Sequence, residues 1–274
     1  MLGSIRRRLG RMLASAAWEK SYSSAMKRSV ARFSFKEALA QLPRGGPLGL
    51  EVLAAHGITA KHASALLRSG WLQRLGRGAY SLPGDELNRD ACLAFLAQQL
   101  PGLHVAAKTA LAWRGVRHNL AFRETVVLWG DRPGRLPAWF SERFSVRYRV
   151  AHIFEPAMPV GLGLAPLPAG RPDLLVSTPE RALLELLSET GSFEGLEEVR
   201  HLVESTRNLR EPVLDELLGH LNRIKVARLA ARLSTELELP WADLALRHSR
   251  RLGGGQRWVA VGRTGERLDL VATP

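Results

Sequence analysis

The side chains best suited to bind another molecule are basic and polar residues between positions 59 and 77. Lysine and arginine donate hydrogen bonds to phosphate oxygens, and together with serine, threonine and histidine they also reach the edges of bases. Their concentration in a short stretch is typical of a DNA-binding surface. The candidate DNA-binding residues are Thr59, Lys61, His62, Ser64, Arg68, Arg74 and Arg77.

The elements that must position these residues form a helix-turn-helix pattern. Apolar spacing predicts helices over 35–42, 48–55 and 60–68. His56-Gly57-Ile58 predicts the tight turn between the last two, and Thr59 is a favourable N-cap for the last. In a helix-turn-helix the start of the second helix enters the major groove.

A hairpin is predicted directly after the recognition helix. Residues 71–75 and 79–82 have strand composition, and between them Arg77 stands between two glycines. Such a hairpin is the wing of a winged helix, and Arg77 at its tip can reach a phosphate or a minor groove. The alternative is a protein-contact module whose basic residues are an ordinary solvated face.

The distribution of charge favours the DNA-binding interpretation. Residues 1–84 contain fourteen Lys and Arg against three acidic residues, whereas residues 85–274 contain twenty-five against twenty-three. A basic amino-terminal third beside a nearly neutral remainder indicates an anion-binding module joined to a body with another task.

Motifs for catalysis are missing from the sequence. It contains no phosphate-binding G-x-x-x-x-G-K-[ST] loop, no G-x-S-x-G turn and no H-E-x-x-H pair. Pro172-Asp173 before a predicted strand suggests a metal-dependent nuclease, but the acid-x-lysine strand typical of such enzymes does not follow. His104, His118 and His152 are interpreted as packing or surface residues. We therefore expect no catalytic residues, no metal and no cofactor.

The single cysteine, Cys92, excludes a disulfide framework and a cysteine-based zinc site. It lies among apolar residues and is interpreted as a buried thiol, which fits a reducing cytoplasm. No uncharged apolar run approaches the roughly 18 residues that a membrane-spanning helix needs. We therefore expect a cytoplasmic protein with no membrane partner, and a monomer in solution.

The chain is divided into three predicted segments. Residues 1–32 form a basic extension that is expected to be poorly ordered. Within it, residues 1–25 resemble a targeting presequence in composition, and the alternative is a basic arm that follows a phosphate backbone. Residues 33–84 form the winged helix-turn-helix. Residues 85–274 form a mixed domain, so the fold class is α+β.

Several local features of the third segment carry specific expectations. A helix is predicted over 85–100, and Ser177 with Glu180 reads as a capping box opening an apolar helix. The acidic stretch from Thr178 to Glu204 is interpreted as a solvated helix face, with contact to the basic domain or to a partner as the alternative. The arginines and glycines of 247–257 are interpreted as a plain turn, with an anion-binding nest as the alternative.

Several stretches of this chain resemble the AbiEi antitoxin family. The winged-helix residues Gly57–Thr59, Leu66–Leu72 and Arg74–Tyr80 carry the first part of the likeness. Further landmarks are Lys108–Leu111, Leu136–Phe140, Ile224–Leu229 and, the most telling, Val176–Leu187 with its Ser-Thr-Pro-Glu-Arg-Ala block. The likeness runs from about Phe35 to the C-terminus. Gly254 and Gln256 stand where the family often has serine and lysine, which weakens the anion-nest interpretation.

The resemblance implies a DNA-binding autorepressor of its own operon that counteracts a cognate nucleotidyltransferase toxin in an abortive-infection, type IV toxin–antitoxin module. Its expected partners are double-stranded operator DNA and that toxin, and direct contact with the toxin stays open. The alternative function is a DNA-targeted nuclease or other enzyme with a winged-helix targeting domain.

The basic residues of the winged helix predict a strong salt dependence. Binding of the four cations Lys61, Arg68, Arg74 and Arg77 should displace counterions from the duplex, so the logarithm of duplex affinity should fall against the logarithm of salt with a slope of roughly −4 or steeper. Titrations at several salt concentrations measure this slope, and a flat dependence would remove the DNA-binding interpretation.

Overall fold

The computed structural model describes residues 35–116, 125–253, 258–261 and 267–270. The basic extension of residues 1–32, His118 and the glycine-rich segment 254–256 lie outside these residues. The chain divides into two compact units. The described part of the amino-terminal unit is 35–44 with 48–85, and the carboxy-terminal unit contains 45–47 and the described residues from Glu86 onward.

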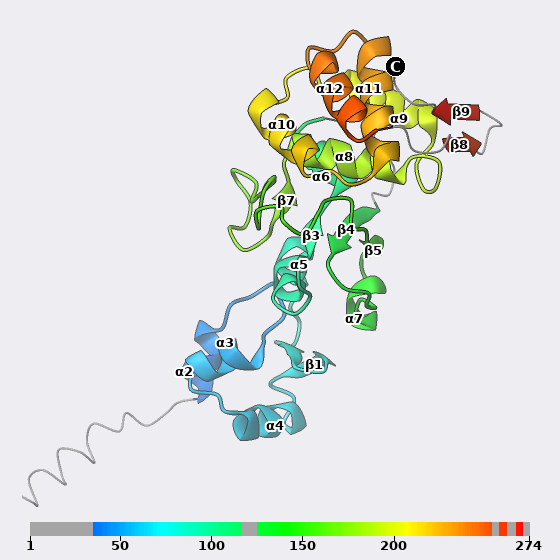
Figure 1. Ribbon diagram of the computed structural model, residues 1–274. Coiled ribbons are helices and arrows are strands. Elements are labelled where there is room, and N and C mark those ends of the chain that lie inside the picture. Colours follow the sequence, from blue (N-terminus) through cyan, green and yellow to red (C-terminus); the bar gives the residue numbers. More distant parts are fainter. Residues whose placement is uncertain (1–34, 117–124, 254–257, 262–266, 271–274) are drawn as a thin grey trace, which may run out of the picture. The chain divides into compact units, whose positions relative to one another are not determined.

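The described amino-terminal unit is a winged helix-turn-helix, as the sequence predicts. Its elements are α2 (Phe35–Gln41), α3 (Leu50–Ala55), α4 (Ala60–Arg68), β1 (Gln73–Gly76) and β2 (Ala79–Ser81) (Figure 1). Leu42, Leu53 and Ile58 belong to one buried apolar cluster. Leu48 exchanges two backbone hydrogen bonds with Tyr80, at 2.7 and 3.0 Å, which ties the hairpin to the segment before α3.

The carboxy-terminal unit contains a five-stranded sheet in the order β5-β4-β3-β7-β6. The strands are β3 (His104–Val105), β4 (Val126–Gly130), β5 (Val146–Val150), β6 (Leu164–Ala165) and β7 (Val176–Ser177). Strand β4 is parallel to β5 and antiparallel to β3, while β7 is parallel to β3 and antiparallel to β6. This mixed sheet confirms the α+β fold class.

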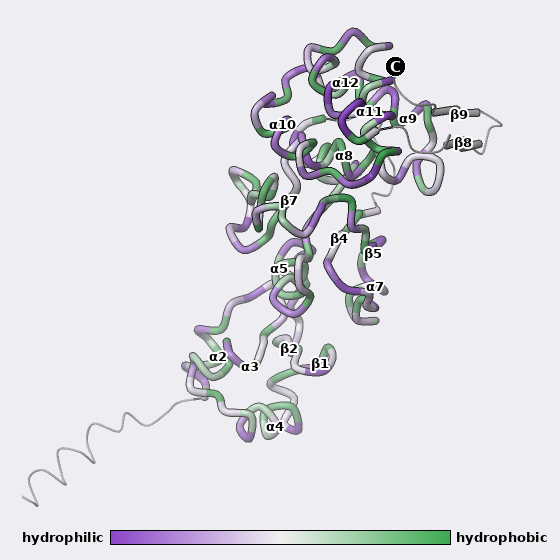
Figure 2. The backbone as a smooth tube through the Cα atoms, viewed as in Figure 1, coloured by the Kyte–Doolittle hydropathy of each residue, from purple (hydrophilic) through white to green (hydrophobic). Residues whose placement is uncertain are grey.

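Helices surround α8, the most buried helix of this unit. The described helices of this unit are α5 (Arg89–Ala97), α6 (Ala107–Trp113), α7 (Ala138–Ser141), α8 (Pro179–Glu189), α9 (Leu196–Glu204), α10 (Glu211–Gly219), α11 (Ile224–Glu236) and α12 (Ala242–Arg251). Helix α8 packs against α6, α9, α10 and α11. Figure 2 shows both hydrophobic and hydrophilic residues along α8. The antiparallel hairpin β8 (Trp258–Val261) and β9 (Arg267–Leu270) follows α12. None of the described helices combines the length and apolar character required to cross a bilayer.

The structure corrects one predicted helix boundary and one predicted turn. The helix expected over 85–100 begins at Arg89, because the Asn88 side-chain oxygen caps it by accepting from the backbone N–H groups of Asp90 and Ala91 at 2.9 and 3.1 Å. The first part of the segment 247–257, which was interpreted as a plain turn, is the last part of α12, and Arg251 of this helix donates to the Leu218 carbonyl near the end of α10. Residues 254–257 of this segment lie outside the described residues. The many basic residues of α12 obscure its helical pattern in the sequence, and the helix is recognised only in the structure, where it packs on α11.

The capping box predicted at Ser177 and Glu180 is wrong. Thr178 is the N-cap residue of α8, with Pro179 in the first turn. The Ser177 hydroxyl bonds instead to the carboxylate of Glu185 at 2.8 Å. The Glu180 carboxylate accepts from the backbone N–H and guanidinium of Arg210, at 2.9 to 3.0 Å. Both side chains are therefore committed to tertiary contacts rather than to the helix end.

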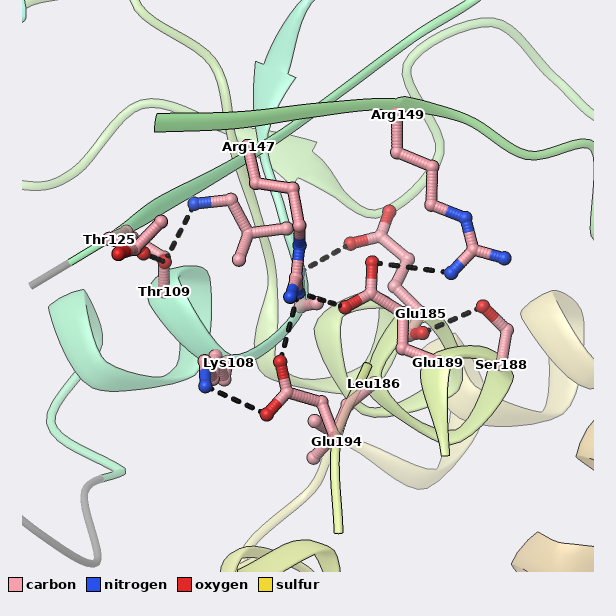
Figure 3. Close-up of polar contacts among 12 residues, drawn as sticks. Lys108, Thr109, Thr125, Arg147, Arg149, Glu185, Leu186, Ser188, Glu189 and Glu194 are labelled. Atoms are coloured by element: carbon pink, nitrogen blue, oxygen red, sulfur yellow. Dashed lines mark hydrogen bonds and ion pairs between the residues drawn. The ribbon is translucent and has the colours of Figure 1, made fainter. Parts of the chain in front are cut away.

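The prediction of a solvated acidic face is also wrong for most of its length. Four of its carboxylates are at least 97% buried, because the exposed fractions of Glu180, Glu185, Glu189 and Glu194 do not exceed 3%. Each is paired with a basic residue of the same unit. Figure 3 shows Glu189 and Glu194 meeting Arg147 from β5, with Lys108 of α6 donating to Glu194 at 2.7 Å.

Glu185 is the most enclosed of these carboxylates. It accepts hydrogen bonds from His104 at 3.1 Å, from the backbone N–H of Ala107 at 3.0 Å, and from Ser177 and Arg181 at 2.8 and 2.9 Å. The other ring nitrogen of His104 lies 2.7 Å from the Gly102 carbonyl oxygen. Both ring nitrogens of His104 therefore lie beside oxygen atoms of the same unit.

This environment fixes Glu185 in its charged form. Burial by itself raises the pKa of the carboxyl, but His104, Arg181 and the Ala107 N–H favour the carboxylate more strongly and lower its pKa from the usual 4.5 to about 2. A carboxyl with a lowered pKa in the folded state stabilises the fold above its unfolded pKa. That contribution is lost as the pH falls from about 4.5 towards about 2.

Removing this carboxylate should strongly destabilise the carboxy-terminal unit. We expect Glu185→Ala to lower the free energy of unfolding by about 3–5 kcal/mol at neutral pH, because His104 and Arg181 lose a buried anionic partner. Denaturant unfolding measures the loss. The matched control is Glu197→Ala on the exposed start of α9, which should change stability by less than about 0.5 kcal/mol. Equal losses in the two variants would contradict the role given to Glu185.

Candidate nucleic-acid interface

Helix α4 is held in place by the turn before it and by its apolar face. Gly57 adopts a left-handed conformation with φ of 76°, and the N–H of Ile58 donates to the Leu53 carbonyl at 2.8 Å. The hydroxyl oxygen of Thr59 accepts from the backbone N–H of His62 at 3.3 Å, which confirms the predicted N-cap. Ala63 is fully buried and anchors the opposite face of the helix.

The predicted DNA-binding residues of α4 lie on its remaining face. Lys61, Ser64 and Arg68 are exposed, and His62 is half-buried. The Ser64 hydroxyl donates to the Ala60 carbonyl at 3.0 Å. Its oxygen therefore remains an acceptor, whereas its proton is already used within the helix. Ser64 is thus suited to receive a hydrogen bond from a donor such as a cytosine or adenine amino group.

The hairpin presents the two arginines of the wing. Strands β1 and β2 pair antiparallel with an irregular register between Arg74 and Gly76. Gly78 adopts φ of 70°, and an added Cβ there would meet nothing within 4 Å. Arg77 is exposed at this tip. Arg74 is also exposed, and its side chain donates to the Gly76 carbonyl at 3.4 Å.

The charge on this surface has a single sign. From His56 to Gly84 the sequence contains Lys61, Arg68, Arg74 and Arg77 and no aspartate or glutamate. The nearest acidic residue after the wing, Asp85, pairs with Arg44 at 2.8 Å. The turn, α4 and the wing therefore create a positive potential that attracts a polyanion.

One exposed aromatic residue beside α4 was not among the predicted site residues. Trp71 was placed in the first wing strand, but β1 begins at Gln73, and Trp71 lies in the bend between α4 and β1. Its backbone N–H donates to the Leu66 carbonyl at 2.9 Å, while 60% of the residue is exposed. An indole at this position adds an apolar contact and one N–H donor to the surface. Its only sequence signal is an aromatic residue directly after a helix-ending glycine.

The groups considered for catalysis are engaged in structural contacts. Asp173, on which the nuclease alternative rests, receives two hydrogen bonds from Arg171 at 2.9 and 2.8 Å. Cys92 is fully buried, and burial raises the pKa of its thiol to about 11. His104 is bound to Glu185, and His152 is exposed. Within the described ranges, no three His, Cys, Asp or Glu side chains are grouped as metal ligands would be.

Comparison with known proteins adds a family and a fold. A family model described as the N-terminal domain of a transcriptional regulator, AbiEi antitoxin, matches residues 32–122. A second, described as a transcriptional regulator, AbiEi antitoxin, type IV TA system, matches residues 123–270. No curated protein matches the chain. Among solved structures, the RV2827C protein from Mycobacterium tuberculosis is similar with a TM-score of 0.52 and 17% identity, over 81% of this chain and 80% of that one.

The position of Lys61 predicts a role in specificity rather than in general affinity. We expect Lys61→Ala to cost about 1–3 kcal/mol on the preferred duplex sequence and much less on random duplex DNA, because an early residue of α4 faces base edges. Titrations of both duplexes measure the difference. The matched control is Lys36→Ala on α2, exposed in the same unit. Equal losses on both duplexes for Lys61→Ala would make Lys61 a phosphate contact only.

Proposed function

Because the chain belongs to the AbiEi antitoxin family of transcriptional regulators of type IV toxin–antitoxin systems, we propose that it represses its own operon and counteracts a cognate nucleotidyltransferase toxin. Repression acts through operator DNA bound by the winged helix-turn-helix. The observation that carries this proposal is the acid-free surface of α4 and the wing in a chain whose two matched segments are both described as transcriptional regulators.

The geometry supports a division of roles within the winged helix. Thr59, Lys61, His62 and Ser64 occupy the first turns of α4, the part of a recognition helix that enters the major groove. Arg68, Arg74 and Arg77 lie at the end of α4 and on the wing, where long guanidinium side chains reach phosphates. We assign sequence reading to the first group and backbone affinity to the second.

The antitoxin role is assigned to the carboxy-terminal unit. Its basic and acidic residues are nearly balanced, and its buried carboxylates are neutralised internally. Its composition is therefore explained without operator DNA. Direct contact with the toxin is not required by this proposal. We expect the protein to act as a monomer in solution.

A wing substitution separates the two roles. We expect Arg77→Ala to weaken repression of the native promoter, because a phosphate contact at the exposed wing tip is lost, while protection against the toxin stays nearly intact. Repression is measured with a promoter reporter, and protection by growth when the toxin is induced. The antitoxin is expressed from an unrelated promoter, since derepression of the native operon would change the doses of both proteins.

The matched control is Arg77→Lys, which keeps a positive charge at the wing tip and should retain most repression. Loss of protection by Arg77→Ala at equal protein levels would contradict the division of roles, and the winged helix would then have to act against the toxin. Full repression by Arg77→Ala would remove the wing from the operator contact.

A further inference from the structure

A cationic and aromatic cluster lies on the carboxy-terminal unit where the chain after β5 meets the start of α11 and the loop after α8. We call it the Phe193 cluster; its members are Arg149, His152, Phe193, Arg223 and Lys225. The segment after β5 is joined to the turn before α11 by backbone hydrogen bonds, from Asn222 to Ile153 and from Glu155 to His220, both at 2.9 Å.

Side-chain contacts complete the cluster. The Arg223 guanidinium donates to the His152 carbonyl at 3.3 Å. The guanidinium carbons of Arg147 and Arg149 lie 4.8 and 5.2 Å from the centre of the Phe193 ring. The amine of Lys225 donates to the Thr190 carbonyl at 2.7 Å, close to the end of α8 and just before Phe193 in the chain. β5 with the residues after it, the start of α11 and the loop after α8 are therefore held together here, with His152 contacted through its backbone carbonyl.

The cluster combines an exposed ring with crowded positive charge. Phe193 is 52% exposed, and Arg223 and His152 are exposed as well. Burial lowers the pKa of Lys225, and the positive charges of Arg149 and Arg223 lower it further, to about 8. These cations repel one another, so an anion bound beside them would lower the electrostatic energy of this surface.

The neighbouring acids neutralise the charge of this cluster only in part. Glu189 and Glu194 are buried and are engaged by Arg147, and Lys108 donates to Glu194 (Figure 3). The indole N–H of Trp129 also donates to Glu189, at 3.0 Å. Arg149 also approaches Glu189, at 3.5 Å. The exposed Glu155 is paired with His220 at 2.9 Å.

We propose that the Phe193 cluster binds a single-stranded segment of nucleic acid, with a base stacked on Phe193 and adjacent phosphates near Arg149, Arg223 and Lys225. Single-strand binders combine cationic groups that follow the backbone with aromatic rings that stack on unpaired bases. A duplex keeps its bases stacked on each other, so operator DNA would leave the ring unused. An acidic peptide would use the cations and leave the ring without a matching partner. The ligand is thus distinct from the operator of the proposed function.

The test uses the full-length protein and fluorescently labelled oligouridylate and oligothymidylate of about 12 nucleotides, a length that covers a typical single-strand site. We expect Phe193→Ala to weaken binding about tenfold through lost stacking. Phe193→Trp should restore it. We expect Arg223→Ala to make the logarithmic salt slope shallower by about 0.7, the value for one phosphate on a single strand. The matched control is Arg200→Ala on α9, an arginine of similar exposure class that pairs with Glu236 outside the cluster.

Two further arms separate this proposal from the winged helix and from other anions. The double variant Lys61→Ala, Arg77→Ala should keep single-strand binding, and Phe193→Ala should keep duplex operator binding, so either site can fail without the other. Tighter binding of oligouridylate than of oligothymidylate would identify the ligand as RNA. Equal affinity for the two would mean that the site accepts either nucleic acid. Unchanged single-strand binding in Phe193→Ala would overturn the proposal. So would loss of that binding in the winged-helix double variant, or equal binding of a polyglutamate peptide.

Discussion

The buried carboxylate of Glu185 joins four elements of the carboxy-terminal unit, α8, β3, α6 and β7. From α8 it receives hydrogen bonds from His104 on β3, Ala107 at the start of α6 and Ser177 on β7. Ala107 adopts a left-handed backbone with φ of 49°, a conformation that costs an alanine on the order of 1 kcal/mol. The hydrogen bond from its N–H to the carboxylate helps to hold it there. Central strands and the helix that covers them are thereby fixed around one charge.

The two units use charge in opposite ways. In the carboxy-terminal unit, Glu180, Glu189 and Glu194 are buried against basic side chains, so much of the charge is consumed inside the fold. In the amino-terminal unit an apolar cluster holds the helices and the hairpin together. The stretch from His56 to Gly84 contains basic residues but no aspartate or glutamate. Positive charge there remains available to a polyanion, which suits a regulator that binds DNA.

The candidate DNA-binding surface depends on rigid supports that are individually small. Ala63 and Ile58 are buried and fix the rotation of α4, so that Lys61 and Ser64 face outward. The backbone pairing of Leu48 with Tyr80 fixes the wing relative to the helices of the same unit. Side chains carried by supported elements lose less freedom when they bind, which favours precise recognition.

The amino-acid sequence determined those features that depend on neighbours along the chain. Thr59 and Gly57 define the start of α4 locally, and the glycines around Arg77 define the wing tip; the structure has both where the pattern indicates. The predictions of a capping box, of a solvated acidic face and of a turn in place of α12 were wrong because these features depend on contacts between segments that are distant in the chain. A carboxylate in sequence carries no sign of a partner such as Arg210 or Arg147, which come from distant segments. Only tertiary packing decided that these acids are buried and paired, because desolvating a charge is tolerated only where another chain segment supplies the opposite charge.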